Sequence, residues 1–289
     1  MKPPKRSIMS TSNLSFKDLA IPHFATVFNH IDEVMAEHGV PYYLIGATAI
    51  ALEFLESGRK APRGTKDIDF AMMVPSLQIH ESIVARLVER GFRKAKAPWT
   101  LYFEVENIAI DLLPFGQIAE KDTADFNERY ADLHILGLGL KEVLGDAKSI
   151  VIEEKIAKIP SLEGMVLLKL IAYSDGPEER ENDTDDILRI IEIYYDQEWE
   201  QITESHFDLL DMEEFDELKI AAEVLGRNSR IHLSKNKKLE ERILSIVNTE
   251  LEGNEESRLV IEWAQKLEKD TVYVKEIIAH FKNGLIHTE

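Results

Sequence analysis

The chain has 289 residues, of which 44% are hydrophobic and 30% charged, and it carries a formal net charge of −19 without a single cysteine. That composition predicts a water-soluble folded protein of one large or two ordinary domains, and it excludes disulfide bonds and thiolate metal sites. Residues 1–15 lack the apolar run of a secretory signal, and no run of about 18 apolar residues predicts a membrane span, so we expect a cytoplasmic protein with no membrane partner.

The negative charge lies in the second part of the sequence. Residues 1–115 contain 13 basic and 13 acidic side chains, whereas residues 116–289 contain 21 basic and 40 acidic ones. Such an acidic surface repels nucleic-acid backbones and most often serves solubility. It suits a protein partner better than RNA.

The first part of the sequence alternates between helical and strand patterns. Apolar residues at helical spacing predict helices, and alternating or continuous apolar runs predict strands with a tight turn at Glu106 and Asn107. The order predicts an α/β module with a mixed sheet. The expected helices cover residues 16–38, 47–58 and 76–91, and the expected strands cover residues 42–46, 67–74, 100–106 and 108–115.

The second part reads as helical from Ser161 onward, after a segment at residues 149–160 that could add one or two short edge strands. We therefore expect the α+β class, with an α/β domain over residues 1–158 and an all-α domain over residues 159–289. The expected helices cover residues 161–174, 183–195, 207–226, 236–248, 256–268 and 271–283.

Asp67 and Asp69 open an otherwise apolar strand and, two residues apart, share one face of it. Two carboxylates this close repel each other unless a cation lies between them. A hard divalent ion such as Mg²⁺ takes oxygen ligands of this kind. The alternative is a solvated strand end with two surface aspartates, which is common in proteins.

Two further features favour the metal site. Asp111 lies between apolar residues of a neighbouring strand, where a lone carboxylate without a partner is costly. Gly46 lies in the turn between a strand and a helix, and the start of a helix offers free N–H groups to phosphate, with the Thr48 hydroxyl as a further donor.

This ordered set resembles the nucleotidyltransferases of the DNA polymerase beta-like superfamily and, within it, the AbiEii/AbiGii toxin-like family. The family pattern has a glycine turn opening a helix, an Arg-x-Ser/Thr-x-Asp-x-Asp strand, a third Asp, and later a Lys, an Arg and an Asp pair. The resemblance covers about residues 40–195 and implies a nucleotidyltransferase-like mixed sheet with flanking helices. The matching positions are Gly46, Ala47, Arg63, Thr65, Asp67, Asp69, Asp111, Lys169, Arg180, Asp183 and Asp186.

The resemblance implies the transfer of a nucleoside monophosphate from an NTP to an acceptor. Asp67, Asp69 and Asp111 would bind Mg²⁺ or Mn²⁺ and, with Lys169, would be the catalytic residues. Asp111 would also help to deprotonate the acceptor hydroxyl. The acceptor is open: an RNA end, a protein hydroxyl or a small molecule. A toxin of a toxin–antitoxin pair, with an antitoxin protein as partner, is a further implication. The implied nucleotide-binding residues are Gly46, Ala47, Thr48, Arg63, Thr65, Lys169 and Arg180.

Alternatives remain at several of these positions. Lys169 lies in a helix that is apolar on nearly every face, and its ammonium could reach a phosphate or extend to water. If it binds phosphate, Lys169→Met would weaken nucleotide binding, and stability would change little or rise because a buried cation is removed. Asp183 and Asp186 could be charges favoured at a helix start or could orient Lys169 or Arg180.

The rival function is a non-catalytic nucleotide-binding or interaction protein on the same fold. Ala47 stands where the family has a second Gly or a Ser, and Asn182 where it has a Lys. The acidic second part of the chain favours the same alternative, because it suits a protein partner.

Overall fold

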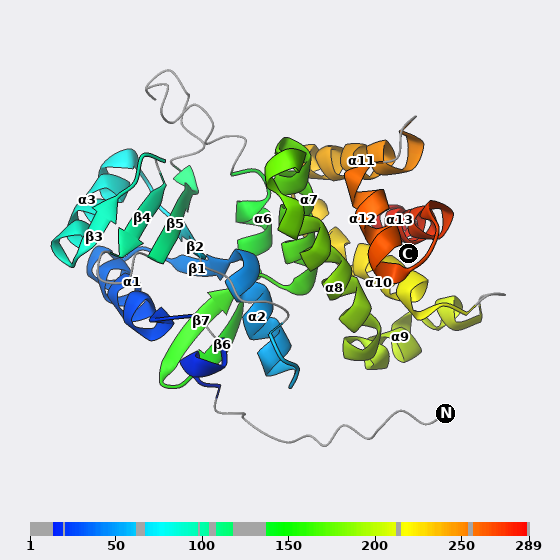
Figure 1. Ribbon diagram of the computed structural model, residues 1–289, viewed down its shortest axis with the longest axis horizontal. Coiled ribbons are helices and arrows are strands. Elements are labelled where there is room, and N and C mark those ends of the chain that lie inside the picture. Colours follow the sequence, from blue (N-terminus) through cyan, green and yellow to red (C-terminus); the bar gives the residue numbers. More distant parts are fainter. Residues whose placement is uncertain are drawn as a thin grey trace. The chain divides into compact units, whose positions relative to one another are not determined.

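The computed structural model describes residues 14–19, 21–61, 67–97, 99–103, 108–117, 137–211, 215–253 and 257–287 (Figure 1). The chain divides into two compact units, which we call the sheet unit (Met1–Asp122 with Ala147–Ile159) and the helical unit (Thr123–Asp146 with Pro160–Glu289). Residues 137–146 precede the last segment of the sheet unit yet belong to the helical unit. The chain therefore passes from the sheet unit to the helical unit and back before Pro160. The expected division into two domains after residue 158 does not describe this exchange.

The sheet unit contains a five-stranded mixed sheet in the order β1-β2-β5-β4-β3. Strands β2 and β5 are parallel, and the other neighbours are antiparallel. The predicted mixed sheet with flanking helices is therefore confirmed. The strands are β1 (Tyr42–Ile45), β2 (Asp67–Met73), β3 (Phe92–Lys94), β4 (Thr100–Phe103) and β5 (Ile108–Phe115).

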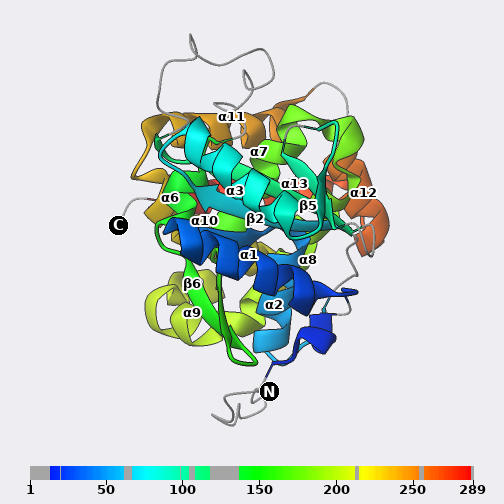
Figure 2. The ribbon, with the colours of Figure 1, turned by 90° about the vertical axis from the view of Figure 1, so that its left-hand side faces the viewer.

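The two faces of the sheet differ in burial. On β2, Ile68, Phe70 and Met72 are fully buried, on the side where helices α1 (Phe24–His38) and α3 (Leu77–Glu89) lie across the strands (Figure 2). Asp67 and Asp69 alternate with these residues and are exposed and half-buried. Since side chains alternate along a strand, one face carries the core and the other presents the carboxylates.

The first predicted helix is broken. Phe16–Leu19 forms a 3₁₀ turn and α1 begins only at Phe24, because Pro22 interrupts the chain and His23 adopts a left-handed conformation with φ 56°. Proline removes a backbone donor and disfavours helical geometry in the residue before it.

Two strand predictions also need correction. The expected helix over residues 76–91 ends at Glu89, and the three residues of β3 follow it as an edge strand that the sequence analysis missed. Strands β6 (Lys148–Ile152) and β7 (Lys155–Ile159) pair with each other in a separate hairpin rather than as edges of the main sheet.

The helical unit confirms the predicted all-α region among the residues that the structure describes. Side-chain caps explain where helices begin: Ser161, Asp216, Asn236, Ser257 and Asp270 each accept a hydrogen bond from a backbone N–H in the first turn. The helices are α6 (Leu140–Leu144), α7 (Leu162–Asp175), α8 (Glu181–Gln197), α9 (Trp199–Ser205), α10 (Glu217–Leu233), α11 (Lys237–Glu252), α12 (Arg258–Leu267) and α13 (Thr271–Ile286).

The predicted helix over residues 207–226 is wrong at its start. Phe207–Asp211 is a 3₁₀ segment, and α10 begins at Glu217, where the Asp216 side chain caps two backbone N–H groups. Helix α9 is an additional helix that the sequence analysis did not include. Within the described residues, no helix is long and apolar enough to cross a membrane.

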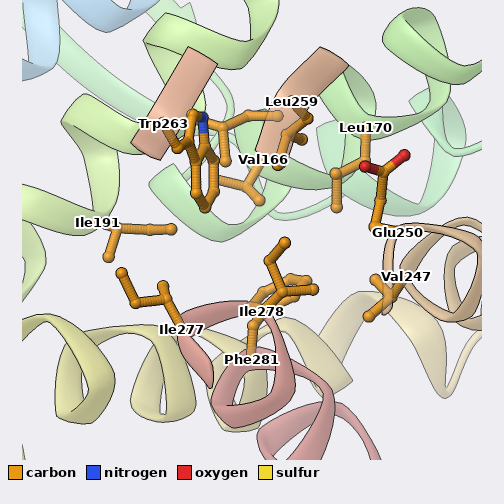
Figure 3. A pocket seen from close by; sticks show the side chains of 11 residues that line it. Val166, Leu170, Ile191, Val247, Glu250, Leu259, Trp263, Ile277, Ile278 and Phe281 are labelled. Atoms are coloured by element: carbon orange, nitrogen blue, oxygen red, sulfur yellow. The ribbon is translucent and has the colours of Figure 1, made fainter. Parts of the chain in front are cut away.

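The core of the helical unit encloses a small apolar cavity of about 20 Å³ between five helices (Figure 3). This volume holds roughly one water molecule, so the cavity is a packing feature and not a substrate site. Glu250 is its one acidic lining residue; burial raises the pKa of this carboxyl, which accepts a hydrogen bond from the Ser257 hydroxyl. The apolar lining comes from Val166, Leu170, Ile187, Ile191, Val247, Leu259, Trp263, Ile277, Ile278 and Phe281.

His80 on α3 makes the stability of the sheet unit sensitive to acid. Its side chain is 3% exposed, and neither ring nitrogen has a hydrogen-bond partner among the described residues. Burial and, to a lesser extent, the charge of Lys94 lower the pKa of His80 from 6.5 to about 4. Between these two values the unfolded chain binds a proton and the folded chain does not, so stability is lost as the pH falls through this window.

We expect this loss to reach roughly 3 kcal/mol in the free energy of unfolding, since each pKa unit corresponds to about 1.4 kcal/mol. Urea titrations above and below the window measure it. His80→Leu should flatten the pH profile in this range, and a variant that loses as much stability as the parent would contradict the assignment to His80.

Candidate active site

The parallel pairing of β2 with β5 brings the predicted aspartates together. Asp69 lies directly opposite Asp111, and Asp67 lies opposite Ala109. Paired residues on adjacent strands are about 4.8 Å apart at Cα, and residues i and i+2 share a face. The backbone therefore presents three aspartates at one corner of the face that does not carry the core.

The two central carboxylates lean in opposite directions. Asp111 Oδ1 accepts a hydrogen bond of 2.5 Å from the Thr100 hydroxyl on β4, whereas Asp69 Oδ2 lies against Gly46, which follows β1. In the strand order β1-β2-β5-β4, these contacts point away from each other. Among the described residues, no group of three or more acidic or histidine side chains is close enough to hold a metal ion.

Two like charges on paired positions repel each other, and a cation between them offsets this repulsion. Divalent ions with carboxylate ligands draw such side chains together. Asp69 and Asp111 fit a divalent cation as a facing pair, with Asp67 two residues before Asp69 at the exposed end of β2. Forming a three-ligand set requires side-chain rotation and no change in strand register.

Gly46 brings the start of helix α2 (Gly46–Glu56) against Asp69. It adopts φ +62°, and a Cβ atom at this position would lie 2.1 Å from Asp69 Oδ2. The carboxylate thus lies at the positive end of the helix dipole, where negative charge is stabilised. Ala47 is half-buried. Thr48 is fully buried, and its hydroxyl has no hydrogen-bond partner in the described part of the chain; its contact with phosphate stays a prediction.

Gly46→Ala should disrupt this corner far more than a comparable substitution elsewhere. Gly39, with φ +63° and nothing within 4 Å of an added Cβ, is the matched control. Both alanines bear the left-handed strain of about 1–2 kcal/mol, but only Gly46→Ala displaces the Asp69 carboxylate. We expect Gly39→Ala to lower the melting temperature alone and Gly46→Ala to lose nucleotide binding as well, as measured by thermal melts and calorimetry. Equal binding by the two variants would contradict the role of Gly46.

Lys169 is held by two aspartates of its own unit. Its ammonium lies 2.8 Å from Asp183 Oδ1 and 2.8 Å from Asp186 Oδ2, and its side chain is 9% exposed. Burial opposes the charge of Lys169, but Asp186 and Asp183 outweigh it, and the net effect raises the lysine pKa. The ammonium therefore remains charged inside the helical unit, in contact with carboxylates. Of the sequence-based alternatives, extension to water is wrong.

The other predicted site residues are placed as follows. Arg180 is exposed just before helix α8. Arg63 and Thr65 lie outside the described residues. Lys169 and Arg180 belong to the helical unit and the three aspartates to the sheet unit, so the shared site expected from the sequence stays a prediction.

Thr100 is a neighbour of the predicted Asp111 that the sequence analysis missed. The expected two-residue turn at Glu106 and Asn107 would set Tyr102 opposite Asp111. The observed register instead pairs Phe103 with Ile108 and Thr100 with Asp111. The turn itself lies outside the described residues, and only the pairing of the strands identifies Thr100.

Comparisons with known proteins give structural similarity alone. No protein-family model matches the chain, and no curated protein matches it. The antibiotic-resistance factor ANT(2″)-Ia, solved in complex with adenylyl-2″-tobramycin, has 15% identity and a TM-score of 0.38 over 57% of this chain and 85% of its own. The solution structure of ANT(2″)-Ia has 14% identity and a TM-score of 0.35, over 63% of this chain and 96% of its own.

An antigenic nucleotidyltransferase-like protein from Paracoccidioides brasiliensis has 15% identity and a TM-score of 0.39, over 80% of this chain and 94% of its own. One of these structures is described as nucleotidyltransferase-like, and another was solved with an adenylylated form of tobramycin. At similarities this low, the function has to be argued from the residues of the chain itself.

Proposed function

We propose that the protein is a metal-dependent nucleotidyltransferase whose acceptor is still to be identified. The observation that carries this proposal is the Asp69–Asp111 pair, in register on parallel strands beside the glycine turn that opens α2. Facing carboxylates on paired strands offer several oxygen ligands to one divalent cation, and such a cation offsets the repulsion between them.

Each part of the corner has a role in this chemistry. Asp69, Asp111 and Asp67 would hold Mg²⁺ or Mn²⁺, which when bound neutralises phosphate charge and polarises the reacting phosphoryl group. Backbone N–H groups at the start of α2 would bind the phosphates of the NTP. The acceptor hydroxyl oxygen would form a bond to the α-phosphorus as the bond to pyrophosphate breaks, and its proton would pass to Asp111. The Thr100 hydroxyl holds the Asp111 side chain in place.

The resemblance of the ordered residues to the AbiEii/AbiGii toxin-like family supports a narrower version. In it the enzyme is the cytoplasmic toxin of a pair, and Lys169 and Arg180 complete the nucleotide site from the second domain. Induced expression should then arrest growth, and Asp69→Asn should abolish the arrest. Continued growth of cells that express the wild-type protein would contradict the toxin role.

The test is incubation with each of the four α-labelled NTPs, Mg²⁺, and separate RNA, protein and small-molecule acceptor pools. Transfer of label that requires metal and disappears in Asp69→Asn supports the proposal. Binding of NTP without transfer to any pool would favour the rival function, a non-catalytic nucleotide-binding protein. The absence of both binding and transfer would contradict both.

A further inference from the structure

The face that carries the aspartates continues across β4 to the edge of the sheet. Thr100 lies opposite Asp111, and Tyr102, two residues further along β4, shares its face. Arg93 on the edge strand β3 lies opposite Tyr102. The aspartate corner and the Tyr102–Arg93 pair therefore belong to one continuous surface, with Tyr102 about 7 Å along the strand from Thr100.

Tyr102 and Arg93 are stacked on each other. The guanidinium carbon of Arg93 lies 4.9 Å from the centroid of the Tyr102 ring, a cation–π contact. Tyr102 is half-buried and Arg93 is exposed. The pair thus presents flat, delocalised groups to solvent on the side of the sheet that carries the carboxylates.

This edge is also locally basic in a protein with a net charge of −19. Arg93 and Lys96 are exposed, and neither forms an ion pair within the described residues. Lys94 is exposed too, but it alternates with Arg93 and lies on the opposite face of the sheet, where its charge acts on His80. Cations without acidic partners are available to bind an external anion. A planar stack beside such cations matches a nucleobase linked to phosphate, because bases stack on aromatic rings and on arginine planes.

We propose that Tyr102 and Arg93 form a stacking platform for a nucleobase, with Lys96, in the segment that follows β3, neutralising the phosphate attached to it. This rests on the proposed function, since the platform positions one of the two reactants of nucleotidyl transfer. The base has two possible sources: the NTP, or the terminal nucleotide of a nucleic-acid acceptor. The strand order favours the acceptor, because the glycine turn lies beside β1 and the platform lies on β4 and β3, with the aspartates between them.

A purely structural role for the pair is the alternative, since cross-strand pairs of this kind stabilise sheets. Tyr102→Val and Tyr102→Phe separate the two. Valine keeps a high strand propensity and removes the ring, whereas phenylalanine keeps the ring and loses only the hydroxyl. Both variants are first checked by thermal melting, so that binding is compared between folded proteins.

The experiment measures the affinity of the full-length protein for each Mg²⁺–NTP and for a short single-stranded RNA oligonucleotide. Tyr102→Val should lower the affinity for one of the two ligands by roughly ten-fold or more, the loss expected for a stacked base. Tyr102→Phe should bind both ligands with the affinity of the parent. Arg93→Lys, which keeps the charge and loses the plane, should show an intermediate loss. Lys158→Ala, an exposed strand cation of the separate hairpin, is the control and should change nothing.

The ligand whose binding is weakened by Tyr102→Val identifies the source of the base. Weaker RNA binding with unchanged NTP binding assigns the platform to the acceptor, and the reverse result assigns it to the NTP. The platform is overturned if Tyr102→Val binds both ligands like the parent, or if the parent binds neither. Binding that depends on Tyr102 in a protein without transferase activity would instead leave the platform standing and contradict the proposed function.

Discussion

Asp69→Asn should reduce nucleotide transfer by roughly a thousand-fold or more while leaving the protein folded. Asn keeps the shape of the side chain and removes the charge that a divalent cation needs from this position. The cation contributes several kcal/mol of transition-state stabilisation, and each 1.36 kcal/mol is a factor of ten in rate. Asp111→Asn should have a similar effect, because Asp111 faces Asp69 across the strand pair.

Stability should respond differently from activity. In metal-free buffer, Asp69→Asn relieves repulsion with Asp111 but weakens the interaction with the helix dipole of α2, which is typically about 0.3–1 kcal/mol. The two effects oppose each other, so we expect a change below about 1 kcal/mol. Asp18→Asn, at an exposed carboxylate of the same unit, is the control for activity. A sharp fall in the melting temperature of Asp69→Asn, or full activity, would contradict the catalytic role.

Lys169→Met should destabilise the helical unit strongly. The substitution leaves Asp183 and Asp186, 12% and 1% exposed, without the cation that they contact. Removing one partner of a buried ion pair costs about 3–5 kcal/mol, which corresponds to a fall of roughly 10 °C in the melting temperature. The sequence alone predicted little change or a rise in stability, because it did not show that both aspartates contact the ammonium.

A combined variant separates the charge effect from the loss of packing. Lys169→Met with Asp183→Asn and Asp186→Asn contains no unpaired buried charge and should recover much of the lost stability. Lys237→Met, which breaks an exposed pair with Glu241, should cost less than about 1 kcal/mol. If Lys169→Met melts like Lys237→Met, the buried triad does not stabilise the unit.

The main sheet could be predicted from the sequence because its pattern is local. Alternation along residues 67–74 and the lone Asp111 in an apolar run identified β2, β5 and the face that the carboxylates share. Strand β3 was missed because three residues, Phe92–Lys94, are too short to show a period. The first helix was predicted over residues 16–38, which is too long, because the helical spacing of apolar residues continues across Pro22.

The finer geometry of the site depends on contacts between distant residues. Sequence spacing placed Asp67 and Asp69 on one face, but it did not show that Asp69 contacts Gly46 while Asp111 turns toward Thr100. The partner of Thr100 depends on the strand register, and the observed register differs by two residues from the one that the expected turn would set. Likewise, the two contacts of Lys169 depend on how α7 and α8 pack, which no local pattern specifies.

Titration with Mn²⁺, followed by electron paramagnetic resonance in the presence of a non-hydrolysable NTP analogue, tests the central claim most directly. If Asp69 and Asp111 hold the catalytic cation, the wild-type protein should bind Mn²⁺, and the Asp69→Asn and Asp111→Asn variants should each lose most of that binding while Asp18→Asn retains it. Equal Mn²⁺ binding by the wild-type protein and both site variants would show that the aspartate corner is not the metal site.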